Sequence, residues 1–320
     1  MTRPRVFVTR RIAEEALKRL AASLEVDVWE GALPPPPDVV RERVAGCDGV
    51  LSLLTERIDA AVLAAAPNLK VVSNMAVGVD NVDVAACTAR RIPVGHTPGV
   101  LTEATADFAF ALLLGAARRL LEGDGYARSG RWKTWEPALL LGKEVHGATL
   151  GIAGFGAIGQ AVARRALAFG MRVLACSRSP RAMPGVEAVD KATLISESDF
   201  LSLHLPLTAQ TRHWLGESEF ARMKAGAVLI NTARGGVVDQ RALVDALNAG
   251  RPAFAALDVT DPEPPGADEP LLRLANVLLA PHLGSGTVQT RTRMALLAAD
   301  NLLAVLEGRR PAHVVNPEVL

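Results

Sequence analysis

The stretch TLGIAGFGAIGQAVARRALAFG, residues 149–170, decides the fold of this chain. An apolar segment with the length of a strand, Thr149–Ala153, leads into the glycine pattern GFGAIG at Gly154–Gly159, and an alanine-rich segment with helical spacing follows. The pattern GxGxxG is informative in this context, between a buried strand and a helix. The first glycine then permits a tight turn, the second admits a pyrophosphate to the backbone, and the third allows the helix to pack closely on the strand.

A helix that begins at this turn is also suited to bind an anion. Its first backbone N–H groups have no partner inside the helix, and its dipole places partial positive charge at the same end. Both features favour a bound phosphate. The sequence therefore predicts a dinucleotide-binding site at Gly154–Gly159, the alternative being a glycine-rich turn without a ligand.

Short apolar segments alternate with helical ones on both sides of this stretch. From residue 149 onward, strands are expected at Thr149–Ala153, Arg172–Cys176, Phe200–Leu203, Ala227–Ile230, Phe254–Leu257 and Val277–Leu279. Before it, strands are expected at Arg5–Thr9, Val26–Trp29, Gly49–Leu53, Leu69–Ser73 and Ile92–Val94. Such alternation predicts parallel sheets covered by helices. We therefore expect an α/β protein with two doubly wound parallel-sheet domains.

Longer features lie between and around these strands. An apolar helix is expected at Leu101–Leu121, a loop rich in glycine and tryptophan at Gly123–Gly130 and on to Trp135, and a last helix at Ser285–Leu306. Asp38 follows a run of four prolines and is a candidate helix cap.

The last helix and the tail need a core on which to pack, and the first series of strands has no C-terminal helix of its own. We therefore assign residues 1–100 and 285–320 to one domain, which binds the substrate. Residues 101–284 are assigned to an inserted dinucleotide-binding domain.

Length and composition agree with this organisation. The chain has 320 residues, of which 49% are hydrophobic and 22% are charged, which excludes disorder as its overall state. A single core stops growing at roughly 250–300 residues, so two domains are expected. The formal net charge of +1 argues against nucleic acid or an anionic membrane as the main partner.

We expect neither a membrane span nor a secretion signal in this sequence. Its longest apolar stretch, Phe108–Ala117, is too short to span a bilayer, and its N-terminus has no signal-peptide core. Cys47, Cys87 and Cys176 form no CxxC pair and lie in apolar segments, so we expect buried free thiols in a reducing cytosol. The expected location is cytoplasmic, and no metal site is assigned.

The end of the second strand of the dinucleotide domain bears on the choice of cofactor. Proteins that bind NAD carry an acidic residue about 20 residues after the glycine pattern, where it binds the ribose. This chain has CSRSPR at Cys176–Arg181 instead. Arg178 and Arg181 are suited to pair with a 2′-phosphate, and Ser177 to donate to it. The sequence thus predicts NADP(H), with NAD(H) possible if Arg178 is an ordinary surface residue.

Three further polar signals follow expected strands of the same domain. Arg234 comes after AVLIN in the segment NTARGG, Asp258 and Glu263 come after AFAAL, and His282 comes after NVLLA in the segment PHLGS. Ligands of open α/β sheets bind outside the carboxyl ends of the strands. An arginine, a carboxylate pair and a histidine are therefore expected on the edge where the cofactor lies.

These residue types suit hydride transfer between a nicotinamide and a 2-hydroxy acid. Reduction of a carbonyl needs a general acid beside its oxygen, and histidine titrates near neutral pH. A nearby carboxylate orients the imidazole ring. A guanidinium can hold a substrate carboxylate in a fork and polarise the adjacent carbonyl. For each of these residues taken alone, the alternative to a catalytic or binding role is a structural role.

At these residues the chain resembles the D-isomer-specific 2-hydroxyacid dehydrogenases over essentially its whole length. The glycine pattern, INTARGG, LDVTDPEP and APHLGS match that family in order and spacing. Within it, the chain is most similar to glyoxylate/hydroxypyruvate reductases, on segments such as SNMAVGVDNVD, HTPGVLTEATADFAFALLL and WKTWEP. The resemblance implies a Rossmann-type cofactor domain inserted into a flavodoxin-like substrate domain, with the site in the cleft.

The resemblance also implies a role for each catalytic residue. His282 would donate the proton in reduction, Glu263 would be its partner carboxylate, and Arg234 would bind the substrate carboxylate and carbonyl. In the first domain, backbone N–H groups of the loop at Ala76–Gly78 would bind the same carboxylate. The substrate-binding residues implied are Leu53, Val77, Gly78, Trp135, Arg234 and His282.

Cofactor contacts are implied over the inserted domain. Thr105 and the glycine pattern would hold the pyrophosphate, and Ala233 with Asp258 would fix the nicotinamide carboxamide. The full set is Thr105, Gly154, Phe155, Gly156, Ala157, Ile158, Gly159, Ser177, Arg178, Ser179, Leu205, Pro206, Thr211, Thr232, Ala233, Arg234, Asp258, His282 and Gly284.

Family members are usually homodimers built through the cofactor domains. The loop with Trp132 and Trp135 resembles an arm that reaches the partner subunit's pocket, the alternative being ordinary interface packing. The main prediction is NADPH-dependent reduction of glyoxylate and hydroxypyruvate. The alternatives are another D-2-hydroxyacid dehydrogenase, acting on a larger 2-keto acid or phosphoglycerate, and a cofactor-sensing corepressor that binds peptides.

Overall fold

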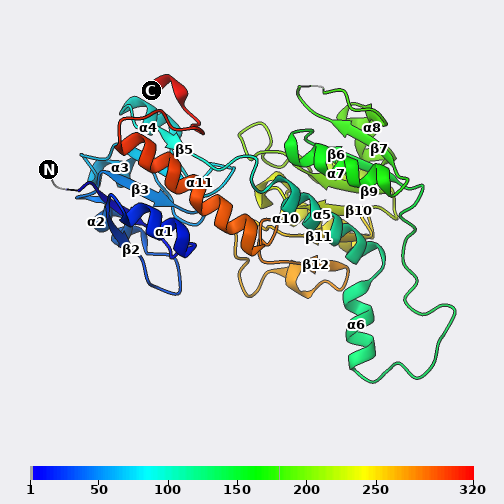
Figure 1. Ribbon diagram of the computed structural model, residues 1–320. Helices are drawn as coiled ribbons and strands as arrows, with labels where there is room; N and C mark the ends of the chain where they lie inside the picture. The colour runs from blue at the N-terminus through cyan, green and yellow to red at the C-terminus, as the bar shows by residue number, and fades with distance from the viewer. Residues whose placement is uncertain (1–2, 180) are drawn as a thin grey trace. The chain divides into compact units, whose positions relative to one another are not determined.

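The computed structural model describes residues 3–179 and 181–320 of the chain (Figure 1). Its internal contacts divide it into two compact units. The first unit comprises the residues up to Leu101 together with Thr287–Leu320, and the second comprises Thr102–Gly286. Each unit is built on its own parallel sheet.

Among the described residues, the first unit contains a five-stranded sheet with the order β2-β1-β3-β4-β5, which is that of flavodoxin-like folds. The strands are β1 (Arg5–Val8), β2 (Glu25–Val28), β3 (Gly49–Ser52), β4 (Val71–Asn74) and β5 (Val94–Gly95), and all pairs are parallel. The helices are α1 (Glu14–Ala21), α2 (Pro37–Val44), α3 (Ala60–Ala65), α4 (Val84–Ala89), α11 (Val288–Leu306) and the 3-10 helix η3 (Pro317–Val319).

Helices cover both faces of this sheet (Figure 1), which explains why its central strands β3 and β4 are buried along their whole length. Phe7 and Val72 face one side, where α2, α3 and α4 pack against them. Alternate positions point to the other face, because successive side chains of a strand alternate. There Ser73 donates a hydrogen bond of 2.7 Å to the carbonyl of Ala298 in α11.

The second unit, in the part that the structure describes, holds a seven-stranded parallel sheet with the order β12-β11-β10-β9-β6-β7-β8. Its strands are β6 (Thr149–Ala153), β7 (Arg172–Cys176), β8 (Val186–Ala188), β9 (Phe200–Leu203), β10 (Val228–Asn231), β11 (Phe254–Leu257) and β12 (Val277–Leu279). Its helices are α5 (Thr102–Ala117), α6 (Leu120–Arg128), α7 (Ala157–Ala168), α8 (Lys191–Glu197), α9 (Glu217–Arg222) and α10 (Gln240–Asn248), with 3-10 helices η1 (Gly235–Val237) and η2 (Pro270–Arg273).

This order is the Rossmann arrangement, with the reversal of strand order between β6 and β9. One core packs α5 and α7 on the sheet through side chains such as Phe110 and Val162. A second core packs α8, α9 and α10 through side chains such as Leu194, Phe220 and Leu243. The predicted fold class, two doubly wound parallel sheets, is confirmed.

The prediction of one continuous helix at Leu101–Leu121 is wrong in its extent. The chain forms α5 and then a separate helix α6, because Arg119 adopts left-handed backbone angles (φ +51°) and breaks the run. The loop expected from Gly123 is therefore helical as far as Arg128. The ion pair between Arg128 and Asp124, four residues apart, supports this helix despite its two glycines.

Other boundaries also differ from the predictions. Asp38 does not cap its helix, because α2 begins at Pro37, whose fixed φ suits the first helical position, and Asp38 lies in the first turn. The last helix begins at Val288 instead of Ser285, because the Thr287 side chain accepts from the Thr290 N–H and caps it. The short edge strand β8 was not predicted, since three residues show no periodicity.

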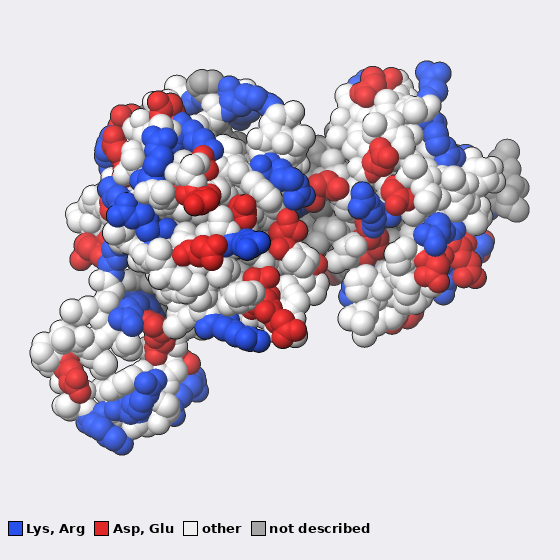
Figure 2. All heavy atoms as spheres, turned by 180° about the vertical axis from the view of Figure 1, so that it is seen from behind, with Lys and Arg blue, Asp and Glu red and all other residues white. Residues whose placement is uncertain are grey.

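No helix among the described residues has both the length and the apolarity to cross a membrane. On the face shown in Figure 2, acidic and basic side chains are interspersed.

Candidate active site

The glycine turn between β6 and α7 has the geometry that a bound pyrophosphate requires. Gly154 has φ +93°, and a Cβ there would lie 2.5 Å from the carbonyl oxygen of His204. A Cβ on Gly159 would lie 2.2 Å from the carbonyl oxygen of Gly154. A Cβ on Gly156, in contrast, would meet no atom within 4 Å. The first and third glycines are thus required by packing, whereas the second leaves open space above the backbone.

This turn lies at the point where the strand order reverses, the usual ligand site of such sheets. Gly156 is the N-cap of α7, a helix of 12 residues whose positive end faces the open space. The residues present therefore fit a dinucleotide. Ala157 and Ile158 form the first turn of α7, and Phe155 is buried beneath it.

A small cavity adjoins the end of β7. Its volume is about 190 Å³, and its lining residues are Phe155, Ala175, Ser177, Arg181, Ala188, Val189 and Asp190. Ser177 Oγ donates to the carbonyl of Ser179 at 2.8 Å, which closes the turn after the strand. Of the two arginines proposed to read the ribose, Arg181 lines this cavity and Arg178 does not, and both are exposed.

The loop after β9 carries three of the expected cofactor residues. Leu205 and Pro206 follow the strand directly, and the Thr211 hydroxyl donates to the carbonyl of Pro206 at 2.5 Å. The same hydroxyl accepts from the Thr208 N–H at 2.8 Å. Thr211 therefore holds the shape of the loop, which sequence reasoning did not anticipate.

The segment after β10 positions Arg234. Asn231 is buried, and its side chain accepts from the Ala233 N–H and donates to the Arg234 carbonyl, each at 3.0 Å. Arg234 is half-buried and donates to the carbonyl of Ala233 at 2.9 Å. The buried hydroxyl of Thr232 has no hydrogen-bond partner among the described residues, as expected of a group that binds a ligand or water.

Gly235 brings this segment against the loop that carries Glu263. A Cβ on Gly235 would lie 1.9 Å from the carbonyl oxygen of Thr260, so no other residue fits there. Gln240 at the start of α10 accepts from the backbone N–H of Asp261 at 2.9 Å, and Arg212 lies 3.4 Å from the Asp261 carboxylate. The Glu263 loop is thus held from two directions.

His282 and Glu263 form the central pair of the site. His282 Nδ1 lies 2.6 Å from Glu263 Oε1, and the two side chains are 22% and 34% exposed. His282 itself has φ +55°, an uncommon backbone conformation for a residue with a side chain. Strain of this kind clusters at functional sites, where surrounding contacts must hold it.

Asp258 supplies those contacts. Its backbone carbonyl accepts from the His282 N–H at 2.9 Å, and its buried carboxylate accepts from the N–H groups of Leu283 and Gly284 at 2.6 and 2.8 Å. Burial raises the pKa of the Asp258 carboxyl, and these two hydrogen bonds oppose the increase. A Cβ on Gly284 would lie 3.4 Å from the Thr105 side chain, so Thr105 borders the same turn.

Arg234, Glu263 and His282 thus follow the neighbouring strands β10, β11 and β12, at the edge of the sheet predicted for them. The arrangement offers a guanidinium, a paired imidazole and a phosphate-binding turn within one unit. It can bind a dinucleotide, hold a small carboxylate and move a proton.

The remaining expected residues lie elsewhere. Leu53 follows β3 of the first unit, and Val77 and Gly78 follow the neighbouring strand β4. Trp135 is 79% exposed in the segment after α6.

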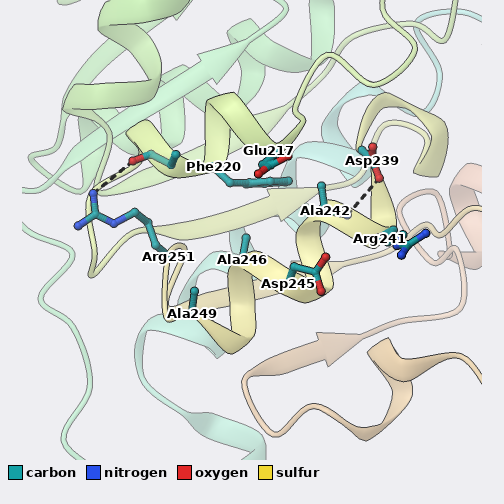
Figure 3. A pocket seen from close by; sticks show the side chains of 10 residues that line it. Glu217, Phe220, Asp239, Arg241, Ala242, Asp245, Ala246, Ala249 and Arg251 are labelled. Carbon is teal, nitrogen blue, oxygen red and sulfur yellow. Dashed lines mark hydrogen bonds between the residues drawn. The ribbon is translucent and has the colours of Figure 1, made fainter.

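A groove in the second unit lies apart from these residues (Figure 3). It has a volume of about 530 Å³ and lies between α9 and α10, with Phe220, Ala242 and Ala246 among its lining residues. None of the predicted site residues lines it.

The second unit therefore defines a nicotinamide-dinucleotide oxidoreductase by its fold and its polar edge. The family model for the D-isomer specific 2-hydroxyacid dehydrogenase NAD binding domain matches residues 110–284. A glyoxylate reductase of Korarchaeum cryptofilum is 52% identical over 99% of this chain and 97% of its own length.

Solved structures give the same result. A protein of Thermus thermophilus superimposes with a TM-score of 0.93 at 51% identity, covering 97% of this chain and 99% of its own. The NADPH-dependent glyoxylate/hydroxypyruvate reductase of Sinorhizobium meliloti, solved with NADP and malonate, has a TM-score of 0.88 at 34% identity, covering 99% and 98%. The chain belongs to the D-isomer-specific 2-hydroxyacid dehydrogenases. It is an NAD(P)-dependent enzyme of that family, as its sequence predicted.

Proposed function

We propose that this enzyme reduces glyoxylate and hydroxypyruvate to glycolate and D-glycerate, with NADPH as the preferred cofactor. The observation that carries the proposal is the His282–Glu263 pair, 2.6 Å apart, on the same sheet edge as Arg234 and the glycine turn. The glyoxylate reductases among its relatives support the substrate class.

The proton is assigned to His282. Because Nδ1 is paired with Glu263, Nε2 is the ring nitrogen that donates to the carbonyl oxygen of the substrate. Glu263 stabilises the charged imidazolium and fixes the orientation of the ring. A bound nicotinamide would supply the hydride and His282 the proton, so that the carbonyl group, an aldehyde in glyoxylate and a ketone in hydroxypyruvate, would become an alcohol.

Arg234 is assigned to the substrate carboxylate and the adjacent carbonyl. The backbone N–H groups of Val77 and Gly78 are proposed as further donors to the carboxylate, and Leu53 as an apolar lining residue. These roles rest on the resemblance to the family and on the place of each residue after a strand end.

NADP(H) is favoured over NAD(H) because no carboxylate stands at the end of β7 within Cys176–Ser179, where an NAD-binding acid is expected. Ser177 and Arg181 line the cavity at that strand end. A guanidinium there would pair with a 2′-phosphate. The NADP bound to the Sinorhizobium meliloti enzyme agrees with this choice.

A homodimer is proposed from the exposed segment around α6. This helix has no buried residue, and the apolar side chains exposed on it and after it are Leu120, Leu121, Trp132, Trp135 and Leu141. Exposed apolar surface of this kind marks an interface. We assign this segment to contact with a second copy of the chain, in the reducing cytosol that the free cysteines favour.

Steady-state oxidation of NADPH and NADH with glyoxylate, hydroxypyruvate and pyruvate tests the proposal. Rapid turnover of glyoxylate or hydroxypyruvate with NADPH is the expected result. Activity mainly with NADH would overturn the cofactor preference, and activity only with larger 2-keto acids would overturn the substrate class.

A further inference from the structure

A network of polar side chains ties together two loops at the carboxyl edge of the first unit's sheet. The loops are residues 53–56, after β3, and residues 75–81, after β4. Strand order in this sheet reverses at β1 and β3, and ligands of such folds bind beyond the strand ends at that point. The network therefore lies where the topology itself predicts a ligand.

Asn81 joins the two loops directly. Its side-chain Nδ2 donates to the backbone carbonyls of Leu53 and Glu56, each at 2.8 Å. Its own backbone carbonyl accepts from the N–H of Ile58 at 2.9 Å. One side chain thus sets the distance between the loop that carries Leu53 and the loop that carries Gly78.

Asn74 at the end of β4 extends the network into the second loop. It is fully buried, and its Nδ2 donates to the Gly78 carbonyl and to Asn81 Oδ1, both at 3.1 Å. Its Oδ1 accepts from the Ser52 hydroxyl at 3.1 Å. These contacts use both the oxygen and the nitrogen of this buried amide. A loop of another shape would leave one of these polar groups unpaired, at a cost in free energy.

Glu56 holds the first loop in place through its buried carboxylate. It is 3% exposed, and its Oε2 accepts from the backbone N–H of Leu53 at 2.9 Å and from the Thr9 hydroxyl at 2.5 Å. Thr9 follows β1, the other strand at the reversal. Burying a carboxylate costs free energy unless hydrogen bonds compensate for the lost water. The bond from the Leu53 N–H is one of those that compensate here, so the burial of Glu56 depends on the shape of the Leu53 loop.

Three successive carbonyls of the second loop accept hydrogen bonds from partners within the unit. Those of Ala76, Val77 and Gly78 accept from the Thr97 N–H at 2.8 Å, from the His96 ring at 3.1 Å and from Asn74 at 3.1 Å. In the described part of the chain, the backbone N–H groups of Val77 and Gly78 donate to no other group. Successive N–H groups left available in this way form a binding site for an anion.

We propose that Asn74 and Asn81 are positioning residues that hold the backbone N–H groups of Val77 and Gly78 in place for the substrate carboxylate. The inference rests on the proposed function, because it takes the 2-keto acid carboxylate as the anion. Asn74 acts by anchoring the Gly78 carbonyl, and Asn81 acts by fixing the loop to the chain at Leu53 and Glu56. Neither side chain needs to touch the substrate.

The test is a comparison of Asn74→Ala with Ser73→Ala. Ser73 is the preceding residue of β4 and is equally buried, but its hydroxyl bonds to α11 and not to the loop. Asn74→Ala is expected to raise KM for glyoxylate about tenfold, the scale of a weakened hydrogen bond to a charged group. KM for NADPH should stay within about twofold, with kcat changed less than KM, as for loss of ground-state binding.

Ser73→Ala should leave the KM for glyoxylate within about twofold of wild type, even where it lowers the melting temperature similarly. Asn81→Ala provides the second variant if Asn74→Ala does not fold, with the same expected change in KM. An unchanged KM in a folded Asn74 or Asn81 variant, or an equal rise in Ser73→Ala, would overturn the inference.

Failure of the proposed function is recognised separately, since it shows as absence of glyoxylate turnover in the wild type. In that case oxalate is titrated calorimetrically into wild type and Asn74→Ala, each saturated with NADP⁺. About tenfold weaker oxalate binding in the variant supports the positioning role. Equal binding, or no binding to wild type, contradicts it.

Discussion

His282 Nδ1 lies 2.6 Å from Glu263 Oε1, although the two residues stand 19 positions apart on loops after different strands. The contact joins the imidazole ring of the proposed proton donor to a carboxylate, and we assign Nε2 of the same ring to the substrate. The loop that carries Glu263 contacts Gly235 closely at Thr260, so the segment with Arg234 and the proposed proton donor are packed together.

Replacing His282 with alanine should lower kcat for glyoxylate by about 10²–10⁴-fold, the range for a positioned acid. NADPH binding, followed by its fluorescence, should persist because the glycine turn is untouched. Glu263→Gln keeps the size of the side chain and should lower kcat less than His282→Ala. Wild-type turnover by His282→Ala at neutral pH would contradict the assignment.

Arg181→Ala should raise KM for NADPH by about tenfold or more, because a guanidinium–phosphate hydrogen bond contributes about 1.5–3 kcal/mol. KM for NADH should change little. Arg178→Ala is the matched control, since Arg178 does not line the cavity, and it should have the smaller effect. Equal KM values for NADPH in all three proteins would show that neither arginine reads the 2′-phosphate.

Two alanine substitutions in the glycine pattern should have opposite consequences. Gly159→Ala places a Cβ 2.2 Å from the Gly154 carbonyl oxygen and should lower the melting temperature by several degrees. Gly156→Ala meets no atom of the chain within 4 Å and should fold normally, yet weaken cofactor binding several-fold by obstructing the pyrophosphate. Thermal unfolding and KM for NADPH measure the two effects, and equal stability of the two variants would refute the packing argument.

Burial lowers the pKa of His204 from 6.5 to about 4. Between these two pH values the ring is neutral in the folded protein, whereas the unfolded chain binds a proton there. The stability that depends on the neutral ring is present above pH 6.5 and is lost as pH falls toward 4. His204→Gln removes this titration. The difference in melting temperature between wild type and variant should therefore narrow from about pH 7 to about pH 4.5, and a constant difference would argue against a buried neutral histidine.

Trp135→Ala should broaden the range of 2-keto acids accepted, if this exposed side chain lines a substrate pocket in a dimer. The measurement is kcat/KM for glyoxylate against bulkier 2-keto acids, combined with sedimentation to follow the oligomeric state. Trp132→Ala is the neighbouring control. Unchanged selectivity in Trp135→Ala would remove this residue from the substrate-binding set.

Much of the fold could be predicted because its signals are local. Strands such as Thr149–Ala153 and Phe254–Leu257 have the predicted bounds, since a buried parallel strand is a short apolar run between turns. The split between α5 and α6 could not be predicted, because apolar residues resume at Leu120 and Leu121 with helical spacing while the backbone at Arg119 adopts left-handed angles. Periodicity reports side chains and not backbone angles.

The candidate site also has some features that the sequence predicts and others that it does not. The positions of Arg234 and His282 at strand ends followed from the sequence, since the carboxyl ends of parallel strands share one edge. The bracing by Asp258, Asn231 and Gln240 did not, because a hydrogen bond between distant segments leaves no pattern along the chain. Asn74 was visible only as a polar residue ending an apolar strand.

The sequence by itself determined the α/β class, the dinucleotide-binding turn and the family, because glycine spacing and strand-end chemistry are properties of short segments. Tertiary structure alone decided which groups meet: the Asn81 amide with the Leu53 and Glu56 carbonyls, Gly235 with Thr260, and Asp258 with the turn at His282. These contacts depend on packing between loops from different strands, where a buried polar group must find a partner or incur its desolvation cost.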